Sequence, residues 1–305
     1  MVYIIKKTAV LCITLFLVSL AVFCAFHIIP GDPAMLILGI EASPEKLDLL
    51  RAELGTDKPL LVQYATWIQG AFHGNFGMSL KYQKAVSELI QGRLSVTFSL
   101  GMISFCLVML LGFPLGILSG YKKTGFIHQA TIFLSLIGIS IPGFFLSVLI
   151  IWIFGLTFHL FVPGHYKGLQ LLFPAFAIAL PQVAVVVKYV SSSIIEEYSK
   201  PYVRTARSRG NSESRILMCH VLKNSTVSVI PLIGMITGSI FSGSIIVEQV
   251  FSISGTGRLL ISSVTSRDFP LTQTIVLYIA STIVLVNFLV DVFIQLIDPR
   301  IRLKY

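Results

Sequence analysis

Charge is scarce in this sequence. Only 12% of the 305 residues are Asp, Glu, Lys or Arg, whereas soluble domains carry about a quarter. Hydrophobic residues make up 55% of the chain, and the mean hydropathy is +0.86. Apolar runs recur at about 20 residues, the length that a helix needs to cross a bilayer. The composition therefore excludes a soluble domain and predicts an all-α polytopic membrane protein.

The motifs that would supply chemistry are also missing. There is no Gly-x-x-x-x-Gly-Lys-Ser/Thr loop for nucleotide phosphates, no His-Glu-x-x-His and no Gly-x-Ser-x-Gly. The four cysteines stand singly and the six histidines are dispersed, so we expect neither a metal site nor a resident cofactor. An intramembrane enzyme would need a nucleophile–base pair or paired carboxylates at membrane depth, and neither is visible. A transport protein is therefore preferred to an enzyme.

Six apolar runs are long enough to cross a membrane. The third is too long for one perpendicular span and is interrupted at Pro142 and Gly143, so it is either one kinked span with an interfacial end or two spans. The first follows Lys6 and Lys7 and exceeds the apolar part of a typical signal peptide, so we expect it to be retained. The runs cover residues 8–29, 96–121, 127–162, 171–191, 227–250 and 271–297.

The distribution of charge decides between these alternatives. With six spans and the N-terminus inside, the inner side holds fourteen basic and four acidic residues, while the outer side holds nine of each. An excess of positive charge on one side is what the positive-inside rule expects. Splitting the third run would place the basic segment 196–224 outside, so one kinked span is preferred. Both termini are then predicted to be cytoplasmic, and the basic composition requires no nucleic-acid partner.

Polar segments divide the chain into four parts. Residues 1–29 form the first span, residues 30–93 an extracellular or periplasmic segment, residues 94–298 a transmembrane domain and residues 299–305 a cytoplasmic tail. In the outer segment, apolar residues at helical spacing around Tyr64 and Trp67 predict an amphipathic helix. This helix lies on the outer surface or against the bundle, or else the segment folds as a small packed subdomain.

The segment 196–224 is a long basic stretch between two spans. Pro201 suits the first position of a helix, and Gly210 suits the position just after its end. Asn211 or Ser212 can cap a second helix that continues through residue 224. We predict that this helix pair offers an apolar knob to a groove of another protein, with a helix pair held by anionic lipid as the alternative. The knob would consist of Tyr202, Val203, Ala206, Ile216, Leu217 and Val221.

Polar residues also occur inside the last two apolar runs. Asn287, Asp291 and Gln295 share one helical face, and Glu248 ends the fifth run. Intramembrane polar residues are costly, which makes Asn287 and Asp291 candidate pathway residues and Glu248 a candidate outer gate. The alternative for each is structural hydrogen bonding.

Small residues recur at four-residue spacing in two runs. Gly112, Gly116 and Gly120 share one face of the second run, and Gly234 and Gly238 share a face of the fifth. Such faces let helices approach closely in lipid. They predict a tightly packed bundle, or contacts with a partner subunit.

The run "YVRTARSRG", residues 202–210, resembles the cytoplasmic E-A-A-x-x-x-G loop of ABC importer permeases. It is similar to the form found in the peptide and nickel branch, in which "HVLKN", residues 220–224, also matches. Arg204 and Thr205 replace the Glu and the first Ala of the general motif, as they do in that branch. Further matches follow in order along the whole chain: "IIPGDPA", "LGTDKPLLVQYATWI", "VEQVFSISGTGRLL" with "RDFPLTQ", and "VDVFIQLIDPRIR".

The resemblance implies a type I ABC importer transmembrane domain in the inner membrane of a bacterium. It implies a second, similar permease, two cytoplasmic ATP-binding subunits that bind the ATP, and an extracellular or periplasmic substrate-binding protein. It also implies alternating access and the import of di- or oligopeptides, with nickel or a metal chelate as the alternative. A self-contained channel or secondary transporter would work without an ATPase and would usually show repeated halves, which are not found. The residues placed at the ATPase contact are Tyr202, Arg204, Thr205, Ala206, Gly210, His220 and Asn224.

Overall fold

The computed structural model describes residues 2–28, 32–39, 42–166 and 168–297, and the elements in these ranges are helices. Five helices are long and apolar enough to cross a membrane, and a bent pair of helices forms a sixth span if it is counted as one. The prediction of an all-helical protein with about six spans is thus confirmed. The five long helices are α1 (Val2–Ile28), α5 (Val86–Tyr121), α8 (Leu172–Tyr198), α11 (Leu222–Val250) and α13 (Phe269–Ile297).

Shorter helices connect these spans. The helix boundaries extend beyond the apolar runs, because hydropathy marks only the part of a helix that meets lipid. For example, α5 starts at Val86, ahead of the run that begins at residue 96. The connecting elements are α2 (Pro33–Leu38), α3 (Pro44–Leu54), α4 (Leu60–Phe72), α6 (Phe126–Ser140), α7 (Gly143–Ile150), η1 (Ile151–Thr157), η2 (Gly168–Leu171), α9 (Pro201–Ser208), α10 (Glu213–Ile216), η3 (Leu217–Val221) and α12 (Thr256–Thr265).

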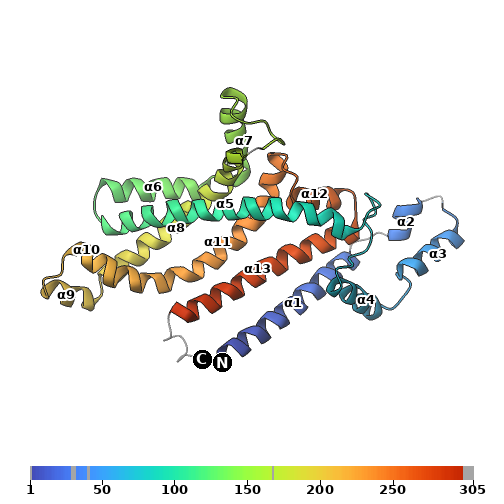
Figure 1. Cartoon of the computed structure of the whole chain (residues 1–305), viewed down its shortest axis with the longest axis horizontal. Helices are drawn as coiled ribbons and strands as arrows, with labels where there is room; N and C mark the ends of the chain where they lie inside the picture. Colours follow the sequence, from blue (N-terminus) through green and yellow to red (C-terminus); the bar gives the residue numbers. More distant parts are fainter. Residues whose placement is uncertain (1, 29–31, 40–41, 167, 298–305) are drawn as a thin grey trace.

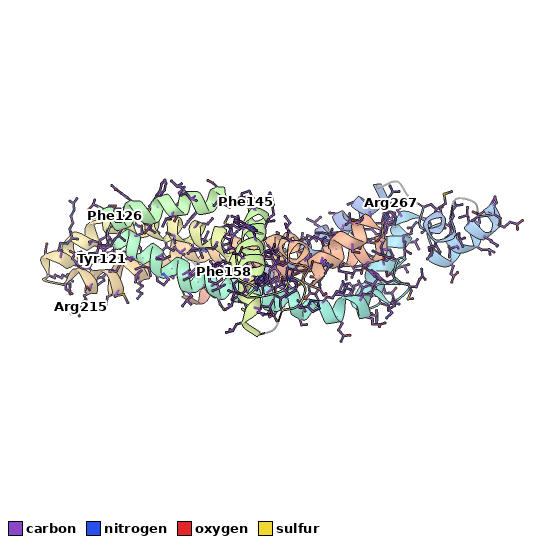
Figure 2. The ribbon with its side chains drawn as sticks, turned by 90° about the horizontal axis from the view of Figure 1, so that it is seen from above. Tyr121, Phe126, Phe145, Phe158, Arg215 and Arg267 are labelled. Atoms are coloured by element: carbon purple, nitrogen blue, oxygen red, sulfur yellow. The ribbon has the colours of Figure 1, made fainter. Side chains whose placement is uncertain are left out.

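The molecule is elongated and has two distinct ends. Figure 1 shows α9 and α10 at one end, which we call the α9 end, and α2 and α3 at the other. α12 lies on the side of the bundle nearer to α2 and α3, and we call that side the α12 end. In Figure 2, Tyr121, Phe126 and Arg215 gather at the α9 end, whereas Arg267 lies toward the α12 end. Membrane depth therefore runs along the length of the molecule.

Glycines bring α5 and α8 into close contact. A Cβ atom added at Gly112 would lie 2.9 Å from the Cβ of Val186, and one at Gly120 would lie 2.8 Å from the Cβ of Ile194. On α11, a Cβ at Gly234 would lie 2.6 Å from the side-chain oxygen of Asn287 on α13. Any larger side chain would force these helices apart. The close helix contacts predicted from the spacing of small residues are confirmed, and they form within the chain.

The third apolar run is a broken span. α6 ends at Ser140, Pro142 precedes α7, and the α7–η1 pair turns by 96° from α6. α6 starts beside the end of α5, where Ser119 contacts His128 at 3.0 Å, and the segment after η1 reaches the end of α11, where Phe161 stacks on Phe251. The run therefore carries the chain once from the α9 end to the α12 end, as one kinked span would.

α1 and α13 pack side by side and run in opposite directions. Lys7, near the start of α1, pairs with Asp291 of α13 at 2.6 Å. Near the other end of both helices, the rings of Phe26 and Phe269 lie 6.3 Å apart. The start of α1 and the end of α13 therefore lie on the same side of the bundle, as an even number of spans requires.

The amphipathic helix α4 packs against the bundle. The Tyr64 hydroxyl lies 2.8 Å from the Ser19 hydroxyl of α1, and Gln63 contacts His27 at 3.0 Å. The rings of Tyr64 and Trp67 also lie 5.4 and 6.0 Å from the ring of Phe23. Of the positions that the sequence left open for this helix, the structure shows the one against the bundle.

The projecting pair α2 and α3 is held together by one acidic side chain. Asp32 accepts a hydrogen bond from the backbone N–H of Ala34 at 2.9 Å and so caps α2. The same carboxylate binds the guanidinium of Arg51 on α3, with contacts of 2.6 and 2.8 Å. Asp32, the acidic residue of the Gly-Asp-Pro motif, thus links α2 to α3. Residues 29–31 and the C-terminal run 298–305, with its Asp-Pro-Arg-Ile-Arg motif, lie outside the described residues.

Candidate functional site

The turn between α9 and α10 depends on Gly210. This residue has φ +78°, in the left-handed region that side-chain-bearing residues rarely adopt. The Gly210 N–H donates to the Arg207 carbonyl at 3.0 Å, and the Asn211 N–H donates to the Ala206 carbonyl at 3.4 Å. This pair of bonds is the Schellman pattern that ends a helix. The glycine-hinged helix pair predicted from the sequence is present, with Pro201 in the first turn of α9.

A cap and an ion pair fix the second helix relative to the first. The Ser212 hydroxyl accepts the N–H of Arg215 at 3.4 Å, so Ser212 rather than Asn211 is the N-cap. Arg207 of α9 grips both carboxylate oxygens of Glu213 at 2.5 and 3.1 Å. The hydrogen bond from Arg207 lowers the pKa of Glu213, with desolvation acting the other way. This bidentate pair bridges the turn on its solvent side.

The apolar side of the helix pair faces the chain's own bundle. Val203, Ile216 and Val221 are fully buried, and Ala206 and Leu217 nearly so. All five belong to the same core cluster as residues of α5, α8 and α11. The prediction of an exposed apolar knob is therefore wrong. The helices are amphipathic because they bury one face against their own protein, and sequence periodicity does not tell which protein provides that cover.

A buried carboxylate anchors α9 to α8 and α11. Glu197, at the end of α8, is 5% exposed and accepts a hydrogen bond from the Tyr202 hydroxyl at 2.6 Å and another from the Lys200 ammonium. Asn224 of α11 also hydrogen-bonds Tyr202. Burial, followed by the bond to Glu197, raises the pKa of Tyr202 to about 12, so the phenol keeps its proton and donates it. Three helices thus meet at one hydrogen-bonded centre.

The exposed side of the helix pair is basic. Five of the seven residues expected at the ATPase contact are exposed: Arg204, Thr205, Gly210, His220 and Asn224. The other two are covered, since Ala206 is buried and Tyr202 is half-buried, with its hydroxyl bonded to Glu197. Asn224 is exposed and also hydrogen-bonds Tyr202. A partner approaching from the α9 end would meet guanidinium groups and backbone. Other exposed residues on this surface are Arg207, Ser208, Arg209, Ser214, Arg215, Met218 and Cys219.

The second helix of the pair does not end near residue 224, as the separate apolar run at 227–250 suggested. α10, the π-helical segment η3 and α11 follow one another without a break from Glu213 to Val250. The hydropathy pattern separated residues 213–224 from the apolar run because these turns of the helix are basic. The helical backbone nevertheless continues through them. The candidate contact surface is therefore the end of a span.

Glu248, near the other end of α11, caps the first turn of α12. It is fully buried, and its carboxylate accepts the N–H groups of Gly257 at 2.7 Å and Arg258 at 3.1 Å, in the first turn of α12. Thr97 of α5 donates a third hydrogen bond at 2.7 Å. A Cβ at Gly255 would lie 2.4 Å from the Glu248 carboxyl group. The glycines of "SGTG", Gly255 and Gly257, leave the space that this carboxylate occupies. The two glycines are visible in the sequence, but the sequence pattern alone does not show that they pack against Glu248. A gating role for Glu248 stays a prediction.

The polar face of α13 meets two other helices. Asp291 pairs with Lys7 of α1, and the side-chain oxygen of Asn287 lies against Gly234 of α11. The first contact is an ion pair between two helices and the second is close packing, and the pathway role of Asn287 and Asp291 stays a prediction. The side chain of Gln295 lies outside the described part of the chain.

The fold and this site define a membrane-spanning component of a transport system. Residues 112–303 match the family described as binding-protein-dependent transport system inner membrane component, and residues 1–101 match the N-terminal part of such membrane components. The chain therefore belongs to this family. It is a multi-pass inner-membrane permease subunit of an ABC transporter rather than an enzyme, and its family works with a substrate-binding protein and an ATPase.

Similar proteins cover the chain almost completely. A protein of Brucella abortus (strain 2308) named as an inferred peptide transport system permease is 34% identical over 308 residues, which span 98% of each chain. The glutathione transport system permease protein of Escherichia coli (strain K12) is 34% identical over 303 residues, or 99% of each chain. The similarity is not limited to one domain.

Proposed function

We propose that this chain is a permease subunit of a type I ABC importer that moves di- or oligopeptides across the inner membrane. The names of the two relatives, both similar to the chain over nearly its whole length, support peptides as the substrate. That observation favours peptides over nickel or a metal chelate. The partners in this proposal are a second, similar permease, two ATP-binding subunits and a substrate-binding protein. ATP is bound by the partner subunits, so this chain needs no cofactor.

The orientation follows from charge. The α9 end carries the basic residues of the helix pair, and the positive-inside rule assigns such a surface to the cytoplasm. The start of α1 and the end of α13 lie on one side of the bundle, so both would be cytoplasmic. The division into a first span, an outer segment at residues 30–93 and a transmembrane domain at residues 94–298 belongs to the same proposal.

The observation that carries the mechanism is the two-sided construction of the helix pair. Its basic side is open to a cytoplasmic partner, while its apolar side is packed into the bundle core. A push on α9 reaches α8 through the contact between Tyr202 and Glu197. A push on α10 reaches α11 directly, because the helix is continuous. Closure of the ATPases would in this way tilt the spans between two states whose populations ATP shifts.

Crosslinking tests the contact with the ATPase. Thr205 is exposed on the basic side, so a Thr205→Cys variant made without the native cysteines should crosslink to an ATPase subunit in membranes. Leu61→Cys is the matched control, because Leu61 is 82% exposed but lies on α4, far along the chain at the opposite side of the proposed membrane. An ATPase crosslink from Leu61→Cys, or none from Thr205→Cys, would contradict the proposed contact.

Uptake tests the substrate. In cells that carry the complete transporter and no other peptide importer, uptake of a radiolabelled dipeptide should depend on this chain, on ATP and on the binding protein. Radioactive nickel, offered alone or with a chelator, is the comparison. Nickel uptake that depends on this chain, without dipeptide uptake, would contradict peptides as the substrate. The assignment of the chain to an ABC importer would still hold.

A further inference from the structure

A polar cleft of about 350 Å³ opens at the α12 end. One wall is a single face of α12, because its lining residues from that helix recur at three- and four-residue spacing. The segment before α5 and the end of α11 supply the rest, so separate parts of the chain converge on one concave surface. Its polar lining consists of Lys81, Gln249, Arg258, Ser262, Thr265 and Ser266.

Two cations line this cleft. The Lys81 ammonium donates to the Ser262 hydroxyl at 2.9 Å, and the Arg258 guanidinium donates to the Ser252 carbonyl at 2.9 Å. Among the residues that the structure describes, neither cation forms an ion pair with a carboxylate. Both keep N–H groups beyond these single bonds, since an ammonium has three and a guanidinium five. The cleft is therefore a cationic surface with donors to spare.

The carboxylates that flank α12 in the chain do not line the cleft. Glu248 and Asp268 are both fully buried. Glu248 is occupied by the first turn of α12, and Asp268 accepts hydrogen bonds from the Ser79 hydroxyl at 2.5 Å and the Lys81 N–H at 3.2 Å. The same two acids hold α12 and the Lys81 backbone in place. The two carboxylates are therefore buried behind the wall of the cleft, and the two cations lie on its open side.

We propose that this cleft is the docking point for an acidic side chain of the substrate-binding protein, an inference that rests on the proposed function. The end opposite α9 is where that protein must arrive, and complementary charge speeds and orients such an encounter. A free peptide is a weaker fit, because its ammonium end would need a carboxylate and both flanking carboxylates are buried. A single carboxylate in the cleft could instead accept bonds from Lys81, Arg258 and the Ser262 hydroxyl together. The hydroxyls of Thr265 and Ser266 donate to backbone carbonyls of α12.

Affinity measurements on the complete transporter test this assignment. The transporter in lipid nanodiscs is titrated with its labelled binding protein at low and at high salt. Lys81→Glu should weaken docking about tenfold at low salt, and the difference should shrink as salt rises. Lys84→Glu is the matched control: Lys84 lies in the same segment, pairs with Glu88 at 3.8 Å and does not line the cleft, so docking should weaken much less than in Lys81→Glu.

A second variant avoids any change at Lys81. Thr265 is exposed on the cleft face of α12, so Thr265→Glu adds a negative charge while Lys81 and Arg258 stay intact. It should weaken docking severalfold, whereas Thr265→Gln, of the same size, should not. For both charge variants, uptake should return toward the wild-type maximum at saturating binding protein, because only the encounter is weakened.

The outcomes separate the two levels of the proposal. Wild-type docking by Lys81→Glu and Thr265→Glu at low salt would overturn the cleft assignment while peptide import stands. Docking weakened equally by Lys84→Glu or Thr265→Gln would also overturn it. A charge outside the cleft, or a larger side chain without charge, would then have the same effect as a negative charge in the cleft. A reduced affinity for free dipeptide with unchanged binding-protein docking would assign the cleft to substrate and refute this proposal. A wild-type transporter that binds no binding protein and imports no peptide would instead refute the proposed function.

Discussion

Replacing Gly210 by valine should uncouple ATP hydrolysis from uptake without unfolding the bundle. A Cβ atom at Gly210 would have nothing within 4 Å, so the substitution creates no clash with the surroundings. The cost comes from the backbone alone, because φ is +78°. A side-chain-bearing residue in the left-handed region costs roughly 1–2 kcal/mol, and a β-branched residue falls at or above the upper end.

A cost of about 2 kcal/mol lowers the ratio of formed to unformed turn about thirtyfold. The strain can be relieved locally, by breaking the Schellman bonds to Arg207 and Ala206, because the turn is exposed while the core beneath it is not. The expected result is a severalfold rise in ATP hydrolysed per peptide imported, with little change in melting temperature. Proteoliposomes that report both rates, and a thermal melt in detergent, measure these quantities.

Gly210→Asn is the matched control, because asparagine adopts the left-handed region several times more readily than most residues. Gly210→Ala should fall between the two. The order of coupling should therefore be Gly, Asn, Ala, Val. Coupling in Gly210→Val equal to wild type would refute the reasoning, and so would an asparagine variant as uncoupled as the valine variant.

Three further substitutions probe other contacts. Tyr202→Phe removes the hydroxyl bonded to Glu197, and loss of a hydrogen bond to a charged group costs roughly 1.5–3 kcal/mol; coupling should fall, measured as ATP hydrolysed per peptide imported. Gly255→Ala places a methyl group against the Glu248 carboxylate and should lower the free energy of unfolding by about 2–4 kcal/mol. The effect should be measured as a lower melting temperature. Lys7→Met should destabilise more alone than when combined with Asp291→Asn, with a coupling energy above about 0.5 kcal/mol in a double-mutant cycle of melting data.

Each of these has a comparison within the chain. Tyr189→Phe, at a tyrosine that is 54% exposed, should leave coupling unchanged. Gly243→Ala should be neutral because a Cβ there meets nothing within 4 Å. An alanine at Gly243 as harmful as one at Gly255 would contradict the close-packing argument, and strictly additive effects at Lys7 and Asp291 would contradict their pairing.

The spans and the helix–glycine–helix pair could be predicted from the sequence because each depends on local chemistry. Apolar length sets a span, and a Gly210 between two cappable helices sets the turn. Pro142 likewise marked the position of the break in the third span. The size of the bend, 96°, depends on packing against neighbouring helices and has no local signature.

The orientation of the helix pair could not be predicted, because periodicity shows that a face is apolar and not what covers it. Val203 and Ile216 would give the same pattern whether they docked into an ATPase or into their own bundle. Glu248 is a similar case. Its position at the end of an apolar run suggested a gate, whereas its three hydrogen bonds come from Thr97, far away in the chain, and from a helix that begins after it.

The helix that runs from Glu213 to Val250 links the two ends of the chain through one continuous helical backbone. At 1.5 Å per residue its 38 residues follow a path of roughly 57 Å. The π-helical segment η3 near one tip and Pro231 inside α11 are the places where this path bends most easily. Glu248 lies near the far tip of this helix and accepts a hydrogen bond from the first turn of α12. In the proposed importer, a displacement at one membrane surface would therefore reach the wall of the cleft at the other surface. By the same linkage, a protein seated on that wall would change the affinity at the distant surface by an equal free energy.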